Sequence, residues 1–451
     1  MALALTVPQR TGRVVATDLD VRVLGPCRYP SPLAHRLAKA AVHYVGNADR
    51  VLLDDRQSAL VAHREEPLRA PAFELAGPRD RVYFETEGLK CAIVTCGGLC
   101  PGVNNVIRGL VLELTQGYGV EDILGFRYGY RGLAADGPEP VHLTPSTVAH
   151  IHHEGGTSLG TSRGEQLPKD MVNRLEELGI GVLFVIGGDG TLRGAMKLVG
   201  EIERRGLAIG VVGIPKTIDN DIHFIDKSFG FETAFSSAVD VIRGAHVEAT
   251  GAYNGIAVVK LMGRHSGFIA CHAAIASTDV DVVLIPEVPI VLGGKGGLFE
   301  FLKGRLEKGH HALCVVAEGA GQELFERTAE ARTDASGNAR FNDVGVALRD
   351  RIVSHFHEEH MDVTVKYIDP SYHIRGAPAS PTDSLYCWNM ARNAVHAAMA
   401  GNTEMLIGRW HGRFVHVPMP LATRFRKQVD TSGDLWTAVV ESTGQPVSWG
   451  T

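Results

Sequence analysis

The sequence predicts an α/β fold of two Rossmann-like lobes, each a parallel sheet with helices on both faces, with a site in the cleft between the lobes and an added N-terminal arm. From residue 90 onward, short apolar runs alternate with amphipathic helical stretches, which is the pattern of βαβ units and a parallel sheet. The apolar runs do not alternate with polar residues, so we expect strands covered on both faces. The chain has 451 residues and 45% hydrophobic content, enough for two domains with their own cores.

The predicted strands and helices follow one another in a regular order. Each helical stretch is amphipathic, so one of its faces can pack on a sheet. Strands are predicted at 90–95, 182–186, 208–214, 255–263, 281–287 and 312–319. Helices are predicted at 103–117, 191–206, 231–249 and 266–277.

Residues 1–88 differ from the rest of the chain, because proline and arginine recur there and the hydrophobic periodicity is weak. We interpret them as an N-terminal extension, or arm, that packs on a core or on another subunit. The remaining boundaries place one lobe at 89–250, a second lobe at 251–420 and a C-terminal appendage at 421–451, and the chain can cross between the lobes.

The composition argues against several classes of partner. A net charge of −6 and a pI near 6.4 provide no basic field for nucleic acid. No apolar stretch approaches the roughly 20 residues that span a bilayer, and the N-terminus lacks the apolar core of a signal peptide. We expect a cytoplasmic protein without membrane association that binds small molecules or another copy of itself. The seven cysteines follow no zinc or disulfide pattern, so we expect free thiols.

Three glycine-containing turns combine backbone freedom with residues that suit an anion. The turn at 95–105 (TCGGLCPGVNN) precedes a helix, whose N-terminal amides attract phosphate. The turn at 186–195 (IGGDGTLRGA) adds Asp189, a carboxylate that can hold magnesium beside phosphates. The turn at 153–165 (HEGGTSLGTSRGE) adds Arg163. None is a P-loop or dinucleotide motif, but three turns with added charge favour a nucleotide or polyphosphate ligand over glycines used only for packing.

The segment 215–221 (PKTIDND) places charge at the end of the strand predicted at 208–214. Open α/β sheets bind ligands at this end of their strands, although a turn in which Asp219 satisfies its own backbone would also explain these residues. Phosphoryl transfer needs a metal held by hard oxygen ligands, a base near the acceptor hydroxyl and cations where charge spreads. Either Asp219 or Asp221 could be the base. The candidate cations are Lys216, Arg163 and Arg264.

Six motifs occur along the chain in this order: GGDGT, PKTIDNDI, KLMGRHSGFIA, IPE, VAEGAGQE and KYIDPSYHIRG. Their order and spacing resemble the 6-phosphofructokinases, a family of ATP- and pyrophosphate-dependent enzymes, and most of all the long plant and trypanosomatid ATP-dependent type. The resemblance covers roughly residues 90 to 420. It implies a magnesium-dependent kinase of glycolysis that transfers the γ-phosphoryl group of ATP to the 1-hydroxyl of fructose 6-phosphate, giving fructose 1,6-bisphosphate.

The resemblance implies roles in the reaction by position. Asp219 matches the general base that takes the proton from the sugar 1-hydroxyl. Asp189 matches the magnesium ligand, and Asp221 matches its partner in metal binding or charge balance. The residues that face the transferring phosphoryl group in this comparison are Thr217, Arg264 and Lys216.

Ligand-binding residues are implied in the same way, with 89–250 as the phosphoryl-donor lobe and 251–420 as the sugar-phosphate lobe. Tyr372 and Arg375 occupy the positions that hold the 6-phosphate, and Lys366 falls where many relatives have an arginine from a neighbouring subunit. The other sugar-binding matches are Met262, Gly263 and Glu287. The donor-site matches are Gly97, Arg163, Gly188, Gly190 and Thr191.

Two positions bear on the choice of donor. Pyrophosphate users typically carry a second aspartate where this chain has Gly190, and that side chain would crowd the α-phosphate of ATP. Lys216 is typical of pyrophosphate enzymes, although plant and trypanosomatid ATP users also resemble PKTIDND. We predict ATP as the donor, because steric exclusion is harder to evade than an added cation. The alternatives are a pyrophosphate-dependent phosphotransferase and a catalytically silent regulatory homologue, and the resemblance further implies a homodimer or homotetramer.

Overall fold

The chain forms two compact units whose bounds differ from the predicted lobes, because the chain crosses between the units more than once. The computed structural model describes residues 14–36, 42–62, 70–325 and 341–450. The first unit contains the described residues up to Thr217, with Ile222–Gly230 and Ala377–Phe425. The second unit contains Ile218–Asp221, Phe231–Gly376 and the described residues from Arg426 onward.

The first unit is built on a nine-stranded sheet with the strand order β3-β4-β17-β16-β10-β9-β6-β7-β8. The run from β16 to β7 is parallel, whereas β8, β17, β4 and β3 run antiparallel to their neighbours. The predicted parallel sheet is therefore confirmed for the run from β16 to β7, and antiparallel strands extend it at both edges. Its strands are β3 (Arg50–Leu52), β4 (Ala72–Leu75), β6 (Lys90–Thr95), β7 (Asp122–Phe126), β8 (Val141–His142), β9 (Ile180–Gly187), β10 (Gly210–Pro215), β16 (Met405–Trp410) and β17 (Arg413–Pro418).

A tight hairpin explains how this sheet changes from parallel to antiparallel. Strands β16 and β17 pair up to Trp410 and Arg413, so that His411 and Gly412 alone form the loop. Both loop residues have positive φ, 48° and 76°, which is the conformation of a two-residue type I′ turn. Glycine at the second position adopts this conformation without strain.

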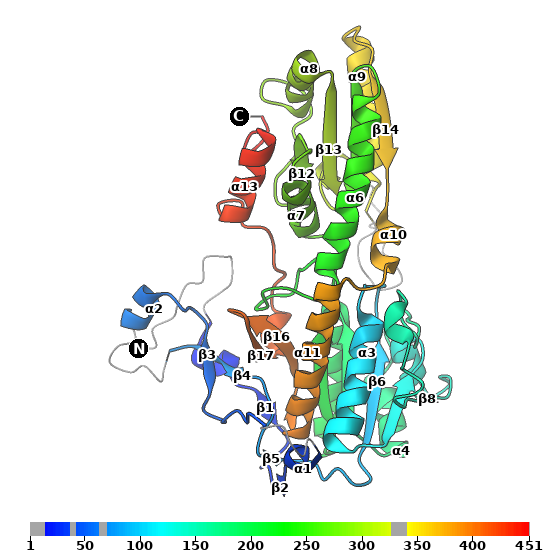
Figure 1. Ribbon diagram of the computed structural model, residues 1–451, viewed down its shortest axis with the longest axis vertical. Helices are drawn as coiled ribbons and strands as arrows, with labels where there is room; N and C mark the ends of the chain where they lie inside the picture. The colour runs from blue at the N-terminus through cyan, green and yellow to red at the C-terminus, as the bar shows by residue number, and fades with distance from the viewer. Residues whose placement is uncertain (1–13, 37–41, 63–69, 326–340, 451) are drawn as a thin grey trace. The chain divides into compact units, whose positions relative to one another are not determined.

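Helices cover both faces of the nine-stranded sheet, as the sequence predicts. The helices of the first unit are α1 (Leu33–Arg36), α2 (Gln57–Ala62), α3 (Val103–Leu112), α4 (Pro168–Glu177), α5 (Asp189–Arg204), α11 (Pro381–Met399) and α12 (Met419–Ala422). Ala92 and Val94 on β6 pack in one cluster with α4, α5 and α12, whereas the intervening Ile93 is buried outside that cluster. Successive side chains point to opposite faces of a strand, so Ile93 faces the other layer. In that layer α11 contacts α3 and β10, and Figure 1 shows α3 and α11 side by side.

The described part of residues 1–88 belongs to the first unit. Strand β4 pairs with β17, and β3 pairs with β4, so both extend the nine-stranded sheet. Two short antiparallel pairs join other segments of this unit. These pairs are β1 (Arg22–Val23) with β15 (Asn402–Thr403), and β2 (Tyr29–Pro30) with β5 (Arg81–Val82).

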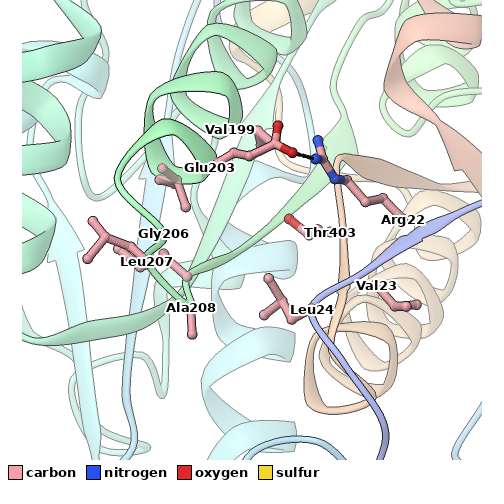
Figure 2. Close-up of a pocket in the computed structure, with 11 residues that line it drawn as sticks. Arg22, Val23, Leu24, Val199, Glu203, Gly206, Leu207, Ala208 and Thr403 are labelled. Atoms are coloured by element: carbon pink, nitrogen blue, oxygen red, sulfur yellow. Dashed lines mark hydrogen bonds and ion pairs between the residues drawn. The ribbon is translucent and has the colours of Figure 1, made fainter.

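A pocket of about 290 Å³ lies where β1 meets the end of α5 (Figure 2). Its wall is partly apolar, with Leu24 and Ile202, and partly charged, with Arg22 and Glu203. Arg22 forms ion pairs with Glu203 and, at 3.1 Å, with Glu404, so the cation in the wall is already neutralised. The described residues that line this pocket include none of the predicted site residues.

The second unit contains a four-stranded sheet with the order β12-β13-β11-β14. All neighbouring strands in it are parallel, which confirms the predicted parallel sheet for this part of the chain. The strands are β11 (Gly255–Leu261), β12 (Val282–Leu284), β13 (His311–Ala317) and β14 (Thr364–Ile368). The helices are α6 (Phe231–Thr250), α7 (Phe268–Ser277), α8 (Leu298–Gly309), α9 (Val344–Glu358), α10 (Ser371–Gly376) and α13 (Asp434–Thr443). None of the described helices, in either unit, is long and apolar enough to cross a membrane.

The C-terminal residues are an integral part of the second unit. Helix α13 contacts α7 and β12 (Figure 1). After α13, the buried amide of Gln445 accepts a hydrogen bond from the Val283 backbone nitrogen at 2.6 Å and donates one to the Val283 carbonyl at 3.2 Å. This side chain thus takes the place of a neighbouring strand at the edge of β12, where backbone groups would otherwise lack partners.

A buried charge cluster connects β4 to β17. Glu74 on β4 lies opposite His416 on β17, with 3.3 Å between Glu74 Oε1 and His416 Nδ1, and Arg79 donates to the same carboxylate at 2.7 Å. Burial opposes ionisation of Glu74, but the hydrogen bonds from His416 and Arg79 outweigh it and lower the pKa to about 2. Burial also lowers the pKa of His416, so Arg79 is the charged partner at neutral pH.

We expect Glu74→Gln to destabilise the protein at neutral pH and to do so less in acid. A pKa lowered from 4.5 to about 2 corresponds to about 3 kcal/mol of unfolding free energy. Because the pKa is lower in the folded state, this contribution is complete above pH 4.5 and is lost as the pH falls toward 2. Urea unfolding from about pH 7 to about pH 3 should show the gap between the two proteins narrowing below pH 4.5. A gap that does not change with pH would contradict this assignment.

Candidate active site

Two glycine turns of the first unit meet at the buried amine of Lys216. Strands β6 and β10 both flank β9 in parallel, so their carboxyl ends lie at the same edge of the sheet. Lys216 follows β10, and its Nζ donates a hydrogen bond to the carbonyl of Gly98, in the turn after β6. Gly97 has a φ of 83°, and a Cβ at this position would stand 3.6 Å from Nζ of Lys216. The backbone of this turn can therefore approach a ligand closely.

The turn that begins α5 lies at the same place. A Cβ at Gly188 would stand 3.3 Å from the carbonyl oxygen of Lys216. A Cβ at Gly97 would stand 4.0 Å from Thr191 Oγ1 in the first turn of the helix. Asp189 is the first residue of α5, so its carboxylate stands at a helix N-terminus, where backbone amides attract anions.

The third predicted turn contacts the first one. Thr161 donates a hydrogen bond from its hydroxyl to the carbonyl of Gly97 at 2.6 Å, and Thr95 donates one to the carbonyl of Gly160 at 2.8 Å. Arg163 follows two residues later in the same turn. Burial lowers the pKa of Lys216, and the positive charge of Arg163 adds to that effect. The structure thus brings the three predicted turns together in one unit.

Lys216 is a buried cation that suits a phosphate ligand. The residue is 6% exposed, and burying a charge is costly unless it is paired and hydrogen-bonded. Among the described residues, the hydrogen-bond acceptor of its Nζ is the Gly98 carbonyl, whereas an ammonium group has three donors. A phosphate held by the glycine turns would accept the remaining hydrogen bonds. Thr217 comes next, and its carbonyl accepts a hydrogen bond from the hydroxyl of Ser228.

Gly190 leaves open space beside Asp189. A Cβ at Gly190 would meet no atom of the described residues within 4 Å. At Gly187, by contrast, a Cβ would stand 2.3 Å from the Thr191 side chain. The structure therefore has room for a ligand at the position where a second aspartate would favour pyrophosphate.

In the second unit, Asp219 has the properties of a base poised near neutral pH. Its Oδ2 accepts a hydrogen bond from the Arg264 backbone nitrogen at 3.3 Å, and its carbonyl accepts one from Ser266 Oγ at 2.9 Å. Burial raises the pKa of Asp219 to about 8, and the negative charges of Asp221 and Glu318 add to this effect. A general base works best when its pKa lies near the working pH. Asp219 is therefore suited to remove a proton from a hydroxyl group.

The two predicted metal ligands belong to different units. Asp189 of the first unit pairs with Arg193 at 3.1 Å, and Asp221 of the second pairs with Arg426 at 3.0 Å. The described residues contain no cluster of three or more His, Cys, Asp or Glu side chains that could hold a metal. Mg²⁺ commonly binds through one or two carboxylates and completes its shell with water and substrate phosphates. Asp189 in the first unit and Asp221 in the second each provide one carboxylate of this kind.

Some of the predicted sugar-binding residues lie in the turn that follows β11, in the second unit. Met262 and Gly263 lead out of this strand, and Gly263 has a φ of 131°, which suits glycine. Glu287 Oε1 accepts hydrogen bonds from the backbone nitrogens of Gly267 at 3.0 Å and Val429 at 2.8 Å. Burial raises the pKa of Glu287. These contacts tie Glu287 to the start of α7 and to the C-terminal segment.

Helix α10 carries the two residues predicted to hold the 6-phosphate. The guanidinium of Arg375 lies over the ring of Tyr372, 4.6 Å from its centre, and Tyr372 is 81% exposed. Lys366, on β14, forms an ion pair with Glu248 at 3.7 Å. Tyr372 and Arg375 thus share one short helix, whereas Lys366 is half-exposed on the preceding strand.

Two residues that the sequence analysis did not assign also lie near the predicted site residues. Glu318, directly after β13, is half-buried, and burial raises its pKa although the nearby positive charge of Arg264 opposes this effect. It belongs to the motif VAEGAGQE, so a signal for it was present in the sequence. Arg426 pairs with Asp221 across 205 residues of sequence, and no local pattern marks such a contact.

Comparison with known proteins shows the family to which the chain belongs. The profile of the phosphofructokinase family matches residues 90–398, well over half of the chain. The protein therefore belongs to the phosphofructokinase family. This confirms the family that the sequence motifs resemble.

Similarity to individual members extends along almost the whole chain. The chain is 51% identical over 440 residues to the ATP-dependent 6-phosphofructokinase of Amycolatopsis methanolica, covering 96% of each chain. It is 46% identical over 423 residues to ATP-dependent 6-phosphofructokinase 1 of Arabidopsis thaliana, covering 93% of this chain and 88% of the relative. It is 41% identical over 435 residues to the ATP-dependent 6-phosphofructokinase of Trypanosoma brucei brucei, covering 95% and 88%. The expected likeness to plant and trypanosomatid enzymes is confirmed.

The solved structures include relatives that differ more in sequence. The pyrophosphate-dependent phosphofructokinase from Marinobacter aquaeolei matches with a TM-score of 0.64 and 19% identity, covering 80% of this chain and 93% of that one. At this level of identity, the match shows a shared fold and carries no information on the donor.

In the protein without ligands, we expect the Asp219 carboxyl group to titrate far above the ordinary aspartate value of 3.8, at about 8. Asp221→Asn should lower that pKa, because it removes the negative charge that raises the pKa of Asp219 most. Carbon-13 NMR of side-chain carboxyl groups measures both values, and Asp219→Asn identifies the signal. An Asp219 pKa near 3.8 in the unsubstituted protein would contradict the described environment.

Proposed function

We propose that this protein catalyses ATP-dependent phosphorylation of fructose 6-phosphate at its 1-hydroxyl, giving fructose 1,6-bisphosphate and ADP. The curated relatives described above are ATP-dependent 6-phosphofructokinases, and they match at 41–51% identity along nearly the whole chain. The structural observation that carries the proposal is the buried amine of Lys216 among glycine turns that suit a polyphosphate. Such a site serves phosphoryl transfer, in which catalysis consists largely of positioning and charge stabilisation.

In this proposal, the first unit binds the donor. Backbone amides of the glycine turns and of the α5 N-terminus hold the phosphates, while Lys216 and Arg163 supply positive charge. The open space at Gly190 admits the α-phosphate and the nucleoside of ATP. The proposed donor-binding residues are Gly97, Arg163, Gly188, Gly190 and Thr191.

The second unit supplies the base. Asp219 takes the proton of the 1-hydroxyl while that oxygen forms a bond to the γ-phosphorus, and the bond between this phosphorus and the leaving oxygen of ADP breaks. Thr217 and Arg264 stabilise the charge on the transferring oxygens. Asp189 and Asp221 hold Mg²⁺. When bound, this ion neutralises charge on the phosphate oxygens.

The sugar phosphate is held by residues after β11, β12 and β14. Arg375 and Tyr372 bind the 6-phosphate, where a guanidinium can donate two parallel hydrogen bonds. The sugar hydroxyls are bound by Met262, Gly263 and Glu287. The proposal includes a homodimer or homotetramer, in which Lys366 serves the sugar site of a neighbouring copy, and a cytoplasmic location.

Use of pyrophosphate as the donor is the second candidate function. It is favoured by the buried Lys216, a residue type that is typical of pyrophosphate enzymes at this position. The open space at Gly190 argues against it, because the carboxylate that would exclude the α-phosphate of ATP is replaced by a hydrogen atom.

Asp219→Ala should lower kcat by about 10²–10⁴-fold, because it removes a general base. A coupled assay of ADP release with fructose 6-phosphate measures this loss. The matched control is Asp240→Ala, which removes an exposed carboxylate on α6 that pairs with Arg243 at 3.1 Å. The control should stay within about twofold of the unsubstituted protein, since exposed ion pairs contribute little. If Asp219→Ala also stayed within a few-fold, another group would have to be the base.

Gly190→Asp should raise the KM for ATP, by about tenfold or more, because the new carboxylate occupies the open space and repels the α-phosphate. The KM for fructose 6-phosphate should change little, since the sugar residues belong to the second unit. Gly200→Asp is the control, because Gly200 lies on the same helix and is equally open. Equal effects of the two substitutions on the KM for ATP would contradict the role given to Gly190.

A further inference from the structure

A buried lysine in the second unit joins three elements at the sugar-binding edge of the sheet. Nζ of Lys260, on β11, lies 2.9 Å from Asp343 Oδ2 and 2.9 Å from Asp369 Oδ2. The Lys260 side chain is only 12% exposed, so its charge needs both carboxylates. Tyr367 on β14 adds a hydrogen bond from its hydroxyl to Asp343 Oδ1 at 3.0 Å. Lys260 therefore belongs to a closed network of charged and polar groups.

Each of the two carboxylates also caps a helix. Asp369 Oδ1 accepts hydrogen bonds from the backbone nitrogen of Ser371, at 3.1 Å, and from its hydroxyl, which fixes the first turn of α10. Asp343 Oδ1 accepts hydrogen bonds from the backbone nitrogens of Gly345, at 3.1 Å, and Val346, at 3.2 Å, at the start of α9. A capping side chain determines where a helix begins and how the chain enters it. By holding the two caps, Lys260 fixes the starts of both helices relative to β11.

The residues that follow these anchor points are those proposed to hold the sugar phosphate. Lys260 lies on β11, two residues before Met262, which directly follows the strand. Asp369 lies three residues before Tyr372 and six before Arg375, on the short helix that it caps. Helix α10 has only six residues, too few to hold its place without outside contacts. Its contacts with α6 and the hydrogen bonds that Asp369 accepts at its start hold this helix in place, and Lys260 holds Asp369.

We infer that Lys260 is a positioning residue for the substrate's phosphate group: through Asp369 it holds α10, and with it Arg375, in register with the end of β11. This inference rests on the proposed function and extends it to a residue that does not itself touch substrate in the proposal. Binding of the sugar phosphate then depends on Lys260, whereas donor binding does not, because the donor residues belong to the other unit.

The test compares Lys260→Met with Lys260→Arg. Methionine keeps much of the apolar stem and leaves two carboxylates without their shared cation, whereas arginine keeps the charge. We expect Lys260→Met to raise the KM for fructose 6-phosphate by about tenfold, since small displacements of a binding group have large effects. Its kcat and its KM for ATP should stay within about twofold, and Lys260→Arg should restore most of the affinity for the sugar phosphate.

Controls separate positioning from general damage. Lys303→Met breaks a more exposed ion pair of the same unit, with Glu359 at 2.7 Å, and should leave both KM values unchanged. Asp369→Ala should reproduce the effect of Lys260→Met, and the double variant should lose less affinity than the sum, because both changes act through one contact. The inference would be overturned if Lys260→Met changed the KM values for fructose 6-phosphate and ATP equally. It would also be overturned if Lys260→Met raised the KM for fructose 6-phosphate no more than Lys303→Met does.

A second measurement does not depend on activity. Hydrogen exchange of the backbone amides in 369–376 should be faster in Lys260→Met than in Lys303→Met, because α10 loses its anchored cap. Equal exchange rates would overturn the inference. If the unsubstituted protein did not turn over fructose 6-phosphate, the proposed function would fail, and the exchange experiment would still decide the role of Lys260.

Discussion

Charged side chains at the ends of buried strands must have partners, and in this protein those partnerships hold residues of the proposed active site. After β10, the amine of Lys216 donates to the carbonyl of Gly98, so one glycine turn is held beside the strand that precedes Asp219, the proposed base. On β11, Lys260 holds the caps of α9 and α10. Strand β10 is hydrogen-bonded on both sides, and β11 is as well, so these charges rest on rigid backbone. The arrangement suits phosphoryl transfer, which depends on positioning.

The burial that makes these partnerships necessary also tunes their chemistry. Burial disfavours the charged form of any group, so it lowers the pKa of Lys216 and raises the pKa of Asp219. The two pKa values thereby change in opposite directions, and in both groups the uncharged form is favoured. A phosphate dianion next to a lysine with a lowered pKa stabilises the charged form of that lysine. An aspartate with a raised pKa is a stronger base. One physical cause, burial, therefore changes the pKa of both the proposed donor-side cation and the proposed base.

The sequence predicted the parts of the fold that have local signatures. Strands β6, β9, β10, β11 and β13 were found because a strand buried on both faces is a continuous apolar run. Strands β3 and β4 were not, because they are short and the partner of β4, β17, lies near the other end of the chain. The helix α11 was not predicted, and its residues fell within the lobe predicted at 251–420, whereas they belong to the first unit. Its contacts with α3 and β10 arise only from tertiary packing. Local pattern shows which face of a helix is apolar, but not which surface covers it.

For the proposed site, too, the sequence predicted the residues that have a local signature and missed those that do not. Motifs located Asp189, Asp219 and Arg264, because their chemistry and their neighbours in sequence go together. They did not reveal the contact of Asp221 with Arg426, or that of Lys260 with Asp343, whose partners lie 205 and 83 residues away. Such pairs are specified by the folded arrangement, so a residue that positions a substrate group through another residue leaves no local sequence pattern.

The most direct test of the account is a comparison of kcat/KM for ATP and for pyrophosphate, with fructose 6-phosphate and magnesium, in the unsubstituted protein. The open space at Gly190 predicts that ATP is preferred by about a hundredfold or more, with ADP and fructose 1,6-bisphosphate formed in equal amounts. Equal or greater efficiency with pyrophosphate would contradict the account, and it would identify Lys216 rather than Gly190 as the residue that decides the donor.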